Sequence, residues 1–408
     1  MIKEIHARQL NVGMYVHKLG VSWLKHPFLT SSFLVSTDSE VEAVMAAEIE
    51  AVWIDTDKGV DVDDSAPAVP VVERSEVENA VVASEPVIAC AVVATAKTPA
   101  RVEMAKARRL CLQAKSQVMS MFNDARMGKV VSTADAMPLV EEISASVLRN
   151  PGALISVARI KTYDEYTYLH SVAVCGLMVV TARRLGLDEV QVREAGMAGL
   201  MHDLGKARMP LEVLNKPGKL TDDEYAIMKS HPEAGWEMLK AAGETNATVL
   251  DVALHHHEKV DGTGYPHRLQ GGDISLMSRM GAVCDVYDAI TSNRPYKAGW
   301  DPAESVKRMA SWQGHFDDTV FKAFVRSVGI YPVGALVRTR TDKLAVVVEQ
   351  HETSMLTPVI HVFFSAVANA PIAQQRVDLA SPSCREKIVG IEDAAKWGFE
   401  NLERFWMV

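Results

Sequence analysis

The chain has 408 residues, which predicts two or three domains and provides ample material for a buried core. Its formal net charge of −9 excludes a protein that coats nucleic acid or anionic membrane through a broad basic face, so no nucleic acid polymer is expected as a partner. The five cysteines are scattered without a Cys-x-x-Cys pair, which favours a reducing compartment over a disulfide framework.

The N-terminal sequence lacks an apolar segment of signal-peptide length. No run elsewhere approaches the roughly 20 consecutive apolar residues that a membrane-spanning helix needs. We therefore predict a cytoplasmic protein without a membrane span.

Residues 1–60 predict a small N-terminal α/β module. Short strands at 14–16 and 33–35 are separated by turn-forming residues, and a helical pattern at 41–50 precedes a strand at 51–55. The composition then shifts to Ala, Val, Pro and Glu without helical periodicity. We predict a linker over residues 61–102.

Residues 103–330 predict a helical domain, because apolar residues recur there at helical spacing. Local signals mark several helix starts: Asp188 is a suitable N-cap, and Thr221 with Glu224 forms a capping box. Pro232 suits the first turn of a new helix. The expected helices span 103–126, 135–148, 165–185, 188–202, 247–257, 274–292, 302–312 and 319–328, and we expect the second of them to stop before Asn150-Pro151.

Residues 331–408 predict a β-rich extension packed on the helical domain as a lid. Apolar runs at 335–338, 344–349 and 359–364 indicate an antiparallel meander, closed by a helix near 393–397. The expected fold class is therefore mainly α, with a small α/β module before the helical bundle and a β extension after it.

Imidazole and carboxylate side chains recur on successive predicted helices of this domain. His202-Asp203 ends one helix, His231 precedes Pro232, and three consecutive histidines end another helix at 255–257. Helix bundles build metal clusters in their cores from side chains arranged in this way. Two metal ions a few Å apart can polarise a phosphate and activate water near neutral pH.

Four motifs follow one another along this domain: His202-Asp203-Leu204-Gly205-Lys206, Lys216-Pro217-Gly218-Lys219-Leu220, the segment from His256-His257-Glu258 to Asp261-Gly262-Thr263-Gly264-Tyr265-Pro266, and Asp285-x-x-Asp288-Ala289. They resemble the motifs of the HD-GYP family of cyclic di-GMP phosphodiesterases. The resemblance covers residues 103–330, and residues 1–60 are similar to a small domain often found before HD-GYP domains. It implies an HD-superfamily helical bundle with a regulatory module in front of it.

The resemblance implies two divalent metal ions, with Fe as the first expectation and Mn or another transition metal as alternatives, since imidazole and carboxylate suit several metals. Asp203 is the expected bridging ligand. Some relatives complete a third site with a glutamate where this chain has Tyr166, and the adjacent Glu165 points about 100° away on a helix. His255 is expected to be an exposed or supporting histidine. The implied ligands are His170, His202, Asp203, His231, His256, His257 and Asp285.

The resemblance also implies the residues that act on the substrate. Asp203 and Lys206 are the expected catalytic residues, and Lys206 contacts phosphate and protonates the leaving oxygen, because neighbouring cations lower a lysine pKa. Arg294 and Lys297 are the expected phosphate-binding pair, since a guanidinium matches phosphate oxygens in a fork.

Two further residues are expected at the nucleotide. Tyr265 lies in the turn-forming loop 261–266, where it contacts the nucleotide or a partner protein, or simply belongs to a tight turn. Asp288 follows Asp285 by three residues and so shares its helix face. We expect Asp288 either to support a metal ligand or to bind a guanine edge.

The expected function is metal-dependent hydrolysis of cyclic di-GMP to pGpG, with further hydrolysis to GMP left open. Two alternatives stand beside it: an HD-superfamily phosphohydrolase acting on another nucleotide, and a non-catalytic cyclic di-GMP sensor or docking protein. The resemblance is compatible with a regulatory protein partner, bound through the N-terminal module or the loop 261–266, and with a homodimer.

Overall fold

A computed structural model of the chain describes residues 2–19, 32–46, 49, 51–61, 100–159, 166–292, 299–351 and 354–406. It divides into two compact units, Met1–Ala94 and Thr95–Val408. The predicted phosphate-binding residues Arg294 and Lys297 lie outside the described residues, as does Glu165. No helix in the described part of the chain is long and apolar enough to cross a membrane.

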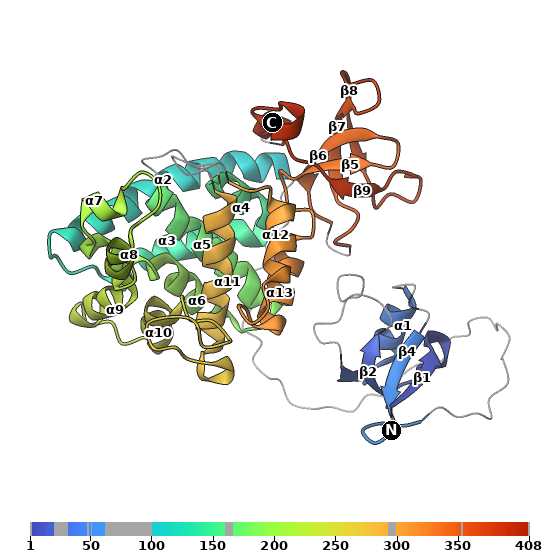
Figure 1. The fold of residues 1–408 in the computed structure, drawn as a ribbon, viewed down its shortest axis with the longest axis horizontal. Helices are drawn as coiled ribbons and strands as arrows, with labels where there is room; N and C mark the ends of the chain where they lie inside the picture. Colours follow the sequence, from blue (N-terminus) through green and yellow to red (C-terminus); the bar gives the residue numbers. More distant parts are fainter. Residues whose placement is uncertain are drawn as a thin grey trace, which may run out of the picture. The chain divides into compact units, whose positions relative to one another are not determined.

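The first unit contains an antiparallel sheet with the strand order β1-β4-β2-β3 (Figure 1). Its elements are β1 (Ile2–His6), β2 (Tyr15–Leu19), β3 (Phe33–Leu34), α1 (Asp38–Ala46) and β4 (Ala51–Asp55). Alternate strand residues such as Val16, Val52 and Ile54 form a buried core with Val44 of α1. The predicted α/β module is confirmed, although strand β1 was not expected.

The second unit begins with a helical domain (Figure 1). Helix α5 is buried on every side from Leu169 to Ala182, as expected for the central helix of a bundle. Helices α2, α4, α6, α11 and α13 pack around it. The helices are α2 (Ala100–Arg126), α3 (Thr133–Arg149), α4 (Pro151–Arg159), α5 (Tyr166–Arg184), α6 (Glu189–Met201), α7 (Leu211–Leu214), α8 (Asp222–Met228), α9 (His231–Ala241), α10 (Ala247–His255), α11 (Leu276–Thr291), α12 (Pro302–Ser311) and α13 (Asp318–Val328).

The predicted helix starts are confirmed. Asp188 accepts hydrogen bonds from the backbone N–H groups of Val190 and Gln191, at 2.8 and 2.9 Å. Thr221 caps α8 together with Glu224, and Pro232 lies in the first turn of α9.

Helix α4 was not expected. The chain does leave helical geometry at Asn150, whose φ is −160°, as a residue before proline should. A new helix then starts at Pro151, because proline at a first helical position loses no needed hydrogen bond. The Asn150 side chain accepts a hydrogen bond from the Ala153 N–H at 3.2 Å. Asn150-Pro151 is therefore a junction between two helices.

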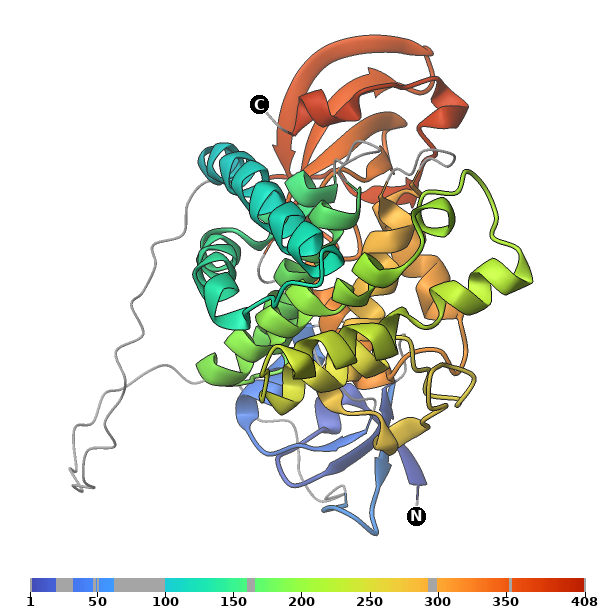
Figure 2. The same ribbon diagram turned by 90° about the vertical axis from the view of Figure 1, so that its left-hand side faces the viewer.

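The second unit ends in an antiparallel sheet with the order β8-β7-β6-β5-β9, drawn in orange to red in Figure 2. Its strands are β5 (Leu336–Thr339), β6 (Lys343–Glu349), β7 (Val359–Ser365), β8 (Ala370–Asp378) and β9 (Ile388–Ile391). The predicted antiparallel meander is confirmed for β5, β6 and β7, and the unpredicted strand β9 returns to pair with β5. Ala303 of α12 shares a buried cluster with Val337, Val347 and Ile360, so helix and sheet have a common core.

Candidate metal centre

The seven predicted metal ligands converge in the core of the helical domain. They come from five places in the chain: the first half of α5, the end of α6, the start of α9, the end of α10 and the middle of α11. Six of them are buried, and the His257 side chain is 21% exposed. The residues are His170, His202, Asp203, His231, His256, His257 and Asp285.

A close approach between two backbone segments brings Asp203 and His231 together. The short 3-10 helix η4 (Leu204–Arg208) follows Asp203 and packs on the start of α9. A Cβ atom at Gly205 would lie 1.9 Å from the carbonyl oxygen of His231 and 2.5 Å from the nitrogen of Gly235. Only glycine allows this approach, which sets Asp203 beside His231.

The two carboxylate oxygens of Asp203 face two different sets of imidazole nitrogens. Its Oδ2 lies 3.4 Å from His170 Nε2 and 3.3 Å from His202 Nε2. Its Oδ1 lies 3.3 Å from His231 Nε2 and 3.8 Å from His256 Nε2. Asp203 is therefore placed between two half-sites.

Asp285 makes a second connection across the centre. Its Oδ1 lies 3.0 Å from His170 Nε2, and its Oδ2 lies 3.7 Å from His257 Nδ1. The ligand atoms of His231, His256 and His257 all lie within 4.8 Å of one another, as do those of His170, His202 and Asp285. Each group of three suits a separate cation.

Hydrogen bonds fix the orientation of the imidazole rings. Three rings direct Nδ1 to a backbone carbonyl oxygen, which accepts an N–H and leaves Nε2 as a ligand atom. These contacts are His202 to Gly199 at 2.8 Å, His231 to Met228 at 2.7 Å and His256 to Val252 at 2.9 Å. In His170 the Nδ1 lies 2.6 Å from the buried Asp288 carboxylate.

Several buried atoms in the centre are placed to bind a cation. His231 Nε2 and His256 Nε2 are 3.2 Å apart, and both Nδ1 atoms face backbone carbonyl oxygens, so the two Nε2 atoms can share one proton or one cation. His202 Nε2 and Asp203 Oδ1 are buried without a hydrogen-bond partner among the described residues. Unpaired buried polar atoms are costly, and a bound cation would satisfy all of them. The residues therefore fit a transition-metal centre of imidazole and carboxylate ligands.

The electrostatics agree with this geometry. Burial lowers the pKa of His257 to about 3, and burial with neighbouring imidazoles lowers the pKa of His256 well below its usual value. Burial opposes ionisation of Asp203, but the charges of His202 and Lys206 outweigh it and hold its pKa well below the usual range. At neutral pH His256 and His257 are therefore neutral ligands, and Asp203 is ionised.

His170 is the exception among the ligands. Burial disfavours its charged form, but hydrogen bonds to Asp203, Asp285 and Asp288 raise its pKa to about 10. Without metal, His170 therefore holds a proton among three carboxylates. A cation must displace that proton in order to bind Nε2.

Lys206 and Tyr265 lie at the edge of the centre. The Lys206 ammonium donates a hydrogen bond to Asp203 Oδ2 at 2.5 Å. The Tyr265 ring stacks on His257, with centroids 4.8 Å apart and planes 28° apart. Burial raises the pKa of Tyr265, so its phenol keeps its hydrogen as a donor. Both predicted residues therefore contact proposed ligands of the centre, Lys206 through Asp203 and Tyr265 through His257.

The sequence reasoning missed the role of Glu258. This buried carboxylate accepts hydrogen bonds from the backbone N–H groups of His267 at 2.7 Å and Leu269 at 3.1 Å. It thereby shapes the loop that carries Tyr265. Its position directly after His256-His257 was the available signal.

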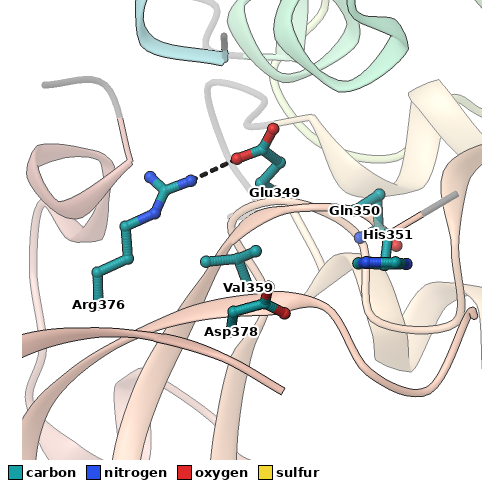
Figure 3. A pocket seen from close by; sticks show the side chains of 6 residues that line it. All are labelled: Glu349, Gln350, His351, Val359, Arg376 and Asp378. Carbon is teal, nitrogen blue, oxygen red and sulfur yellow. Dashed lines mark hydrogen bonds and ion pairs between the residues drawn. The ribbon is translucent and has the colours of Figure 1, made fainter. Parts of the chain in front are cut away.

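A separate hollow of about 490 Å³ lies in the C-terminal sheet (Figure 3). It contains none of the predicted site residues. An ion pair between Arg376 and Glu349 crosses it. The other residues that line it are Gln350, His351, Val359 and Asp378.

The fold and the His/Asp cluster agree with comparisons to known proteins. Residues 150–320 match the HD domain family, and residues 2–136 match a domain of unknown function, DUF3391. A cyclic di-GMP phosphodiesterase of Pseudomonas aeruginosa is 51% identical over 411 residues, which cover all of this chain and 96% of that protein.

Two other relatives match only part of the chain. A cyclic di-GMP phosphodiesterase response regulator of Xanthomonas campestris is 43% identical over 151 residues, 36% of this chain and 39% of that protein. A 3′3′-cGAMP-specific phosphodiesterase of Vibrio cholerae is 34% identical over 193 residues, 47% of this chain and 44% of that protein.

The helical bundle and its buried His/Asp cluster define an HD-domain phosphohydrolase, a class of enzymes that bind divalent metals. The full-length similarity then identifies the family: the chain belongs to the HD-GYP cyclic di-GMP phosphodiesterases. The fold class, the family resemblance and the enzyme class predicted from the sequence are confirmed.

Proposed function

We propose that this protein hydrolyses cyclic di-GMP to pGpG at a centre of two metal ions held by the seven convergent ligands. The observation that carries the proposal is the position of Asp203, whose two oxygens face separate sets of imidazole nitrogens. One ion would be held by His170, His202, Asp203 and Asp285. The other would be held by Asp203, His231, His256 and His257.

The ligand set supports iron as the first candidate, with manganese as the alternative, because both accept mixed imidazole and carboxylate ligands. Bound divalent ions would polarise the phosphodiester and make a nucleophile available from water near neutral pH. Side chains of the protein would protonate the leaving group and bind the nucleotide.

Lys206 is suited to serve the leaving group. Its ammonium lies beside Asp203, at the edge of the centre where the phosphate must approach. We assign it the transfer of a proton to the departing 3′ oxygen. Tyr265, stacked on His257, forms a wall of the site and offers its phenol hydrogen to the nucleotide. Arg294 and Lys297 keep their predicted role as phosphate ligands.

We assign Asp288 a role other than contact with the substrate. It is buried and bonded to His170 Nδ1, so it orients a metal ligand. A carboxylate in this position also makes the imidazole a stronger ligand. We therefore assign Asp288 to the support of His170 and not to a guanine edge.

The test combines metal analysis with product chromatography on protein purified without oxygen. We expect two ions at the seven-residue centre and pGpG as the first product. Cyclic di-GMP and 3′3′-cGAMP should be compared as substrates, because a relative is named for each. Asp203→Ala should remain folded, lose metal and lose turnover. Near wild-type turnover in folded Asp203→Ala would refute the assignment.

A further inference from the structure

A second cluster of imidazole and carboxylate groups lies where α10 meets the loop 258–270. His255 Nε2 is 2.9 Å from His267 Nδ1, and the ring centroids are 5.1 Å apart. His255 adjoins the ligand His256 in sequence but is turned about 100° from it on the helix. Neither ring of the pair belongs to the seven-residue centre.

Asp251 orients the first ring of this pair. Its Oδ1 lies 2.7 Å from His255 Nδ1, and its Oδ2 accepts hydrogen bonds from Ser278 at 2.6 Å and from Ser275. Burial alone would raise the pKa of Asp251, but these hydrogen bonds outweigh it and lower the pKa. The Asp251 carboxylate thus occupies the Nδ1 side of the His255 ring and leaves Nε2 facing His267. A carboxylate behind an imidazole is the usual support of a metal-binding histidine.

We infer that His255 and His267 form a peripheral binding site for Zn²⁺. Zinc binds imidazole nitrogen at about 2.0–2.1 Å in tetrahedral sites, which places two such nitrogens about 3.3 Å apart. The pair therefore needs to open by only about 0.4 Å, and His267 is exposed on a loop. Water completes the coordination. Two imidazoles without a carboxylate ligand select zinc over harder ions such as Mg²⁺.

Zinc at this position joins the loop to the helix that carries two catalytic ligands. His267 follows Tyr265 by two residues, and Tyr265 stacks on the ligand His257. The backbone of His267 is already held by Glu258. A bound ion adds a side-chain attachment to the backbone hydrogen bonds that hold the loop 258–270, and should thereby slow its local opening. The site shares no ligand with the catalytic centre and does not depend on the proposed function.

Zinc binding by the full-length protein tests the site. Equilibrium dialysis with Zn²⁺ is compared for wild type, His267→Gln, His255→Gln and the matched control His17→Gln, an exposed histidine of β2. Wild type and His17→Gln should bind one more zinc ion per chain than the other two variants. Thermal unfolding of the metal-free proteins checks that all four are folded. Equal zinc stoichiometry in wild type and both pair variants would overturn the inference.

Hydrogen–deuterium exchange locates the zinc ion independently of the measured zinc stoichiometry. Zinc added beyond the amount that fills the seven-residue centre should slow exchange of the backbone amides of residues 258–270 in wild type and in His17→Gln, and should leave that exchange unchanged in His267→Gln. Exchange that slows equally in His267→Gln would place the extra ion elsewhere and refute the site.

Discussion

The Asp288 carboxylate lies 2.6 Å from Nδ1 of His170, one of the proposed metal ligands. Asp288→Asn keeps the shape of the side chain but removes its charge. We expect metal affinity or turnover to fall by about 10–100-fold, the usual cost of losing such a supporting group. The KM for cyclic di-GMP should stay unchanged in fully metal-loaded protein. A raised KM with normal metal content would instead place Asp288 against a guanine.

Metal binding should depend on pH through His170. Its pKa of about 10 lies above the ordinary value, so its proton stabilises the metal-free fold at low pH, and this stabilisation is lost as pH rises through about 10. A metal ion competes with the same proton. The apparent metal association constant should therefore rise about tenfold per pH unit in the neutral range. Calorimetric titration with Mn²⁺ in buffers of different ionisation enthalpy should show proton release. A pH-independent affinity would contradict this.

A substitution of Lys206 can distinguish proton transfer to the leaving oxygen from mere positioning of the phosphate. Lys206→Met removes no metal ligand, so metal content should be retained, and substrate binding should weaken only modestly. The chemical step should slow by roughly 10²–10⁴-fold, the usual range for a general acid. A nitrophenyl phosphodiester has a better leaving group and should recover much of that loss. Equal losses on both substrates, in single-turnover measurements, would show that Lys206 only positions phosphate.

The sequence contained enough information to predict which residues meet at the centre, but not how each one acts there. His170 and Asp285 were predicted through motif positions, and the structure brings their side chains within 3.0 Å. The bond from Asp288 to His170 depends on the packing of α5 against α11, which helical spacing does not specify. The pairing of His255 with His267 depends on the path of a loop that no periodic pattern describes.

At the scale of helices, the contact between η4 and α9 places Asp203 beside His231. Gly205→Ala would place a Cβ atom 1.9 Å from a backbone oxygen that cannot move aside easily. We expect the free energy of unfolding to fall by about 1–3 kcal/mol or more, as in other overpacked cores. Metal affinity should fall as well, because Asp203 and His231 move apart.

Gly272→Ala is the matched control for this substitution, because a Cβ atom there meets no neighbouring atom within 4 Å. Its effect should stay within about 0.5 kcal/mol. Chemical denaturation of both variants gives the comparison. Equal free energies of unfolding for the two variants would show that a Cβ atom at Gly205 does not destabilise the fold.

Three elements that were not predicted from the sequence lack a clear local signal. Strand β8 is mostly exposed, and its residues do not show the apolar alternation that marks a half-buried strand. Strand β9 has four residues and is recognisable only through its pairing with β5. Helix α4 begins at a proline, and a proline is as consistent with a helix start as with a stop.

At the scale of the whole molecule, every described ligand of the metal centre belongs to the unit Thr95–Val408. The unit Met1–Ala94 has a hydrophobic core of its own. We therefore expect any regulatory role of the N-terminal module to be separable from metal binding. The boundaries predicted for the linker and the helical domain stay predictions that truncation can test.

Metal removal should affect the two units unequally. A ligand present at 100 times its Kd stabilises the fold that binds it by about 2.7 kcal/mol. Calorimetry of the full chain should thus show two unfolding transitions, and a chelator should lower the Tm of only one. The fragment 95–408 should reproduce the metal-sensitive transition, bind the same number of catalytic ions and retain turnover. A single transition that shifts as a whole would show that the units unfold together, and loss of metal from the fragment would show that residues 1–94 help to build the centre.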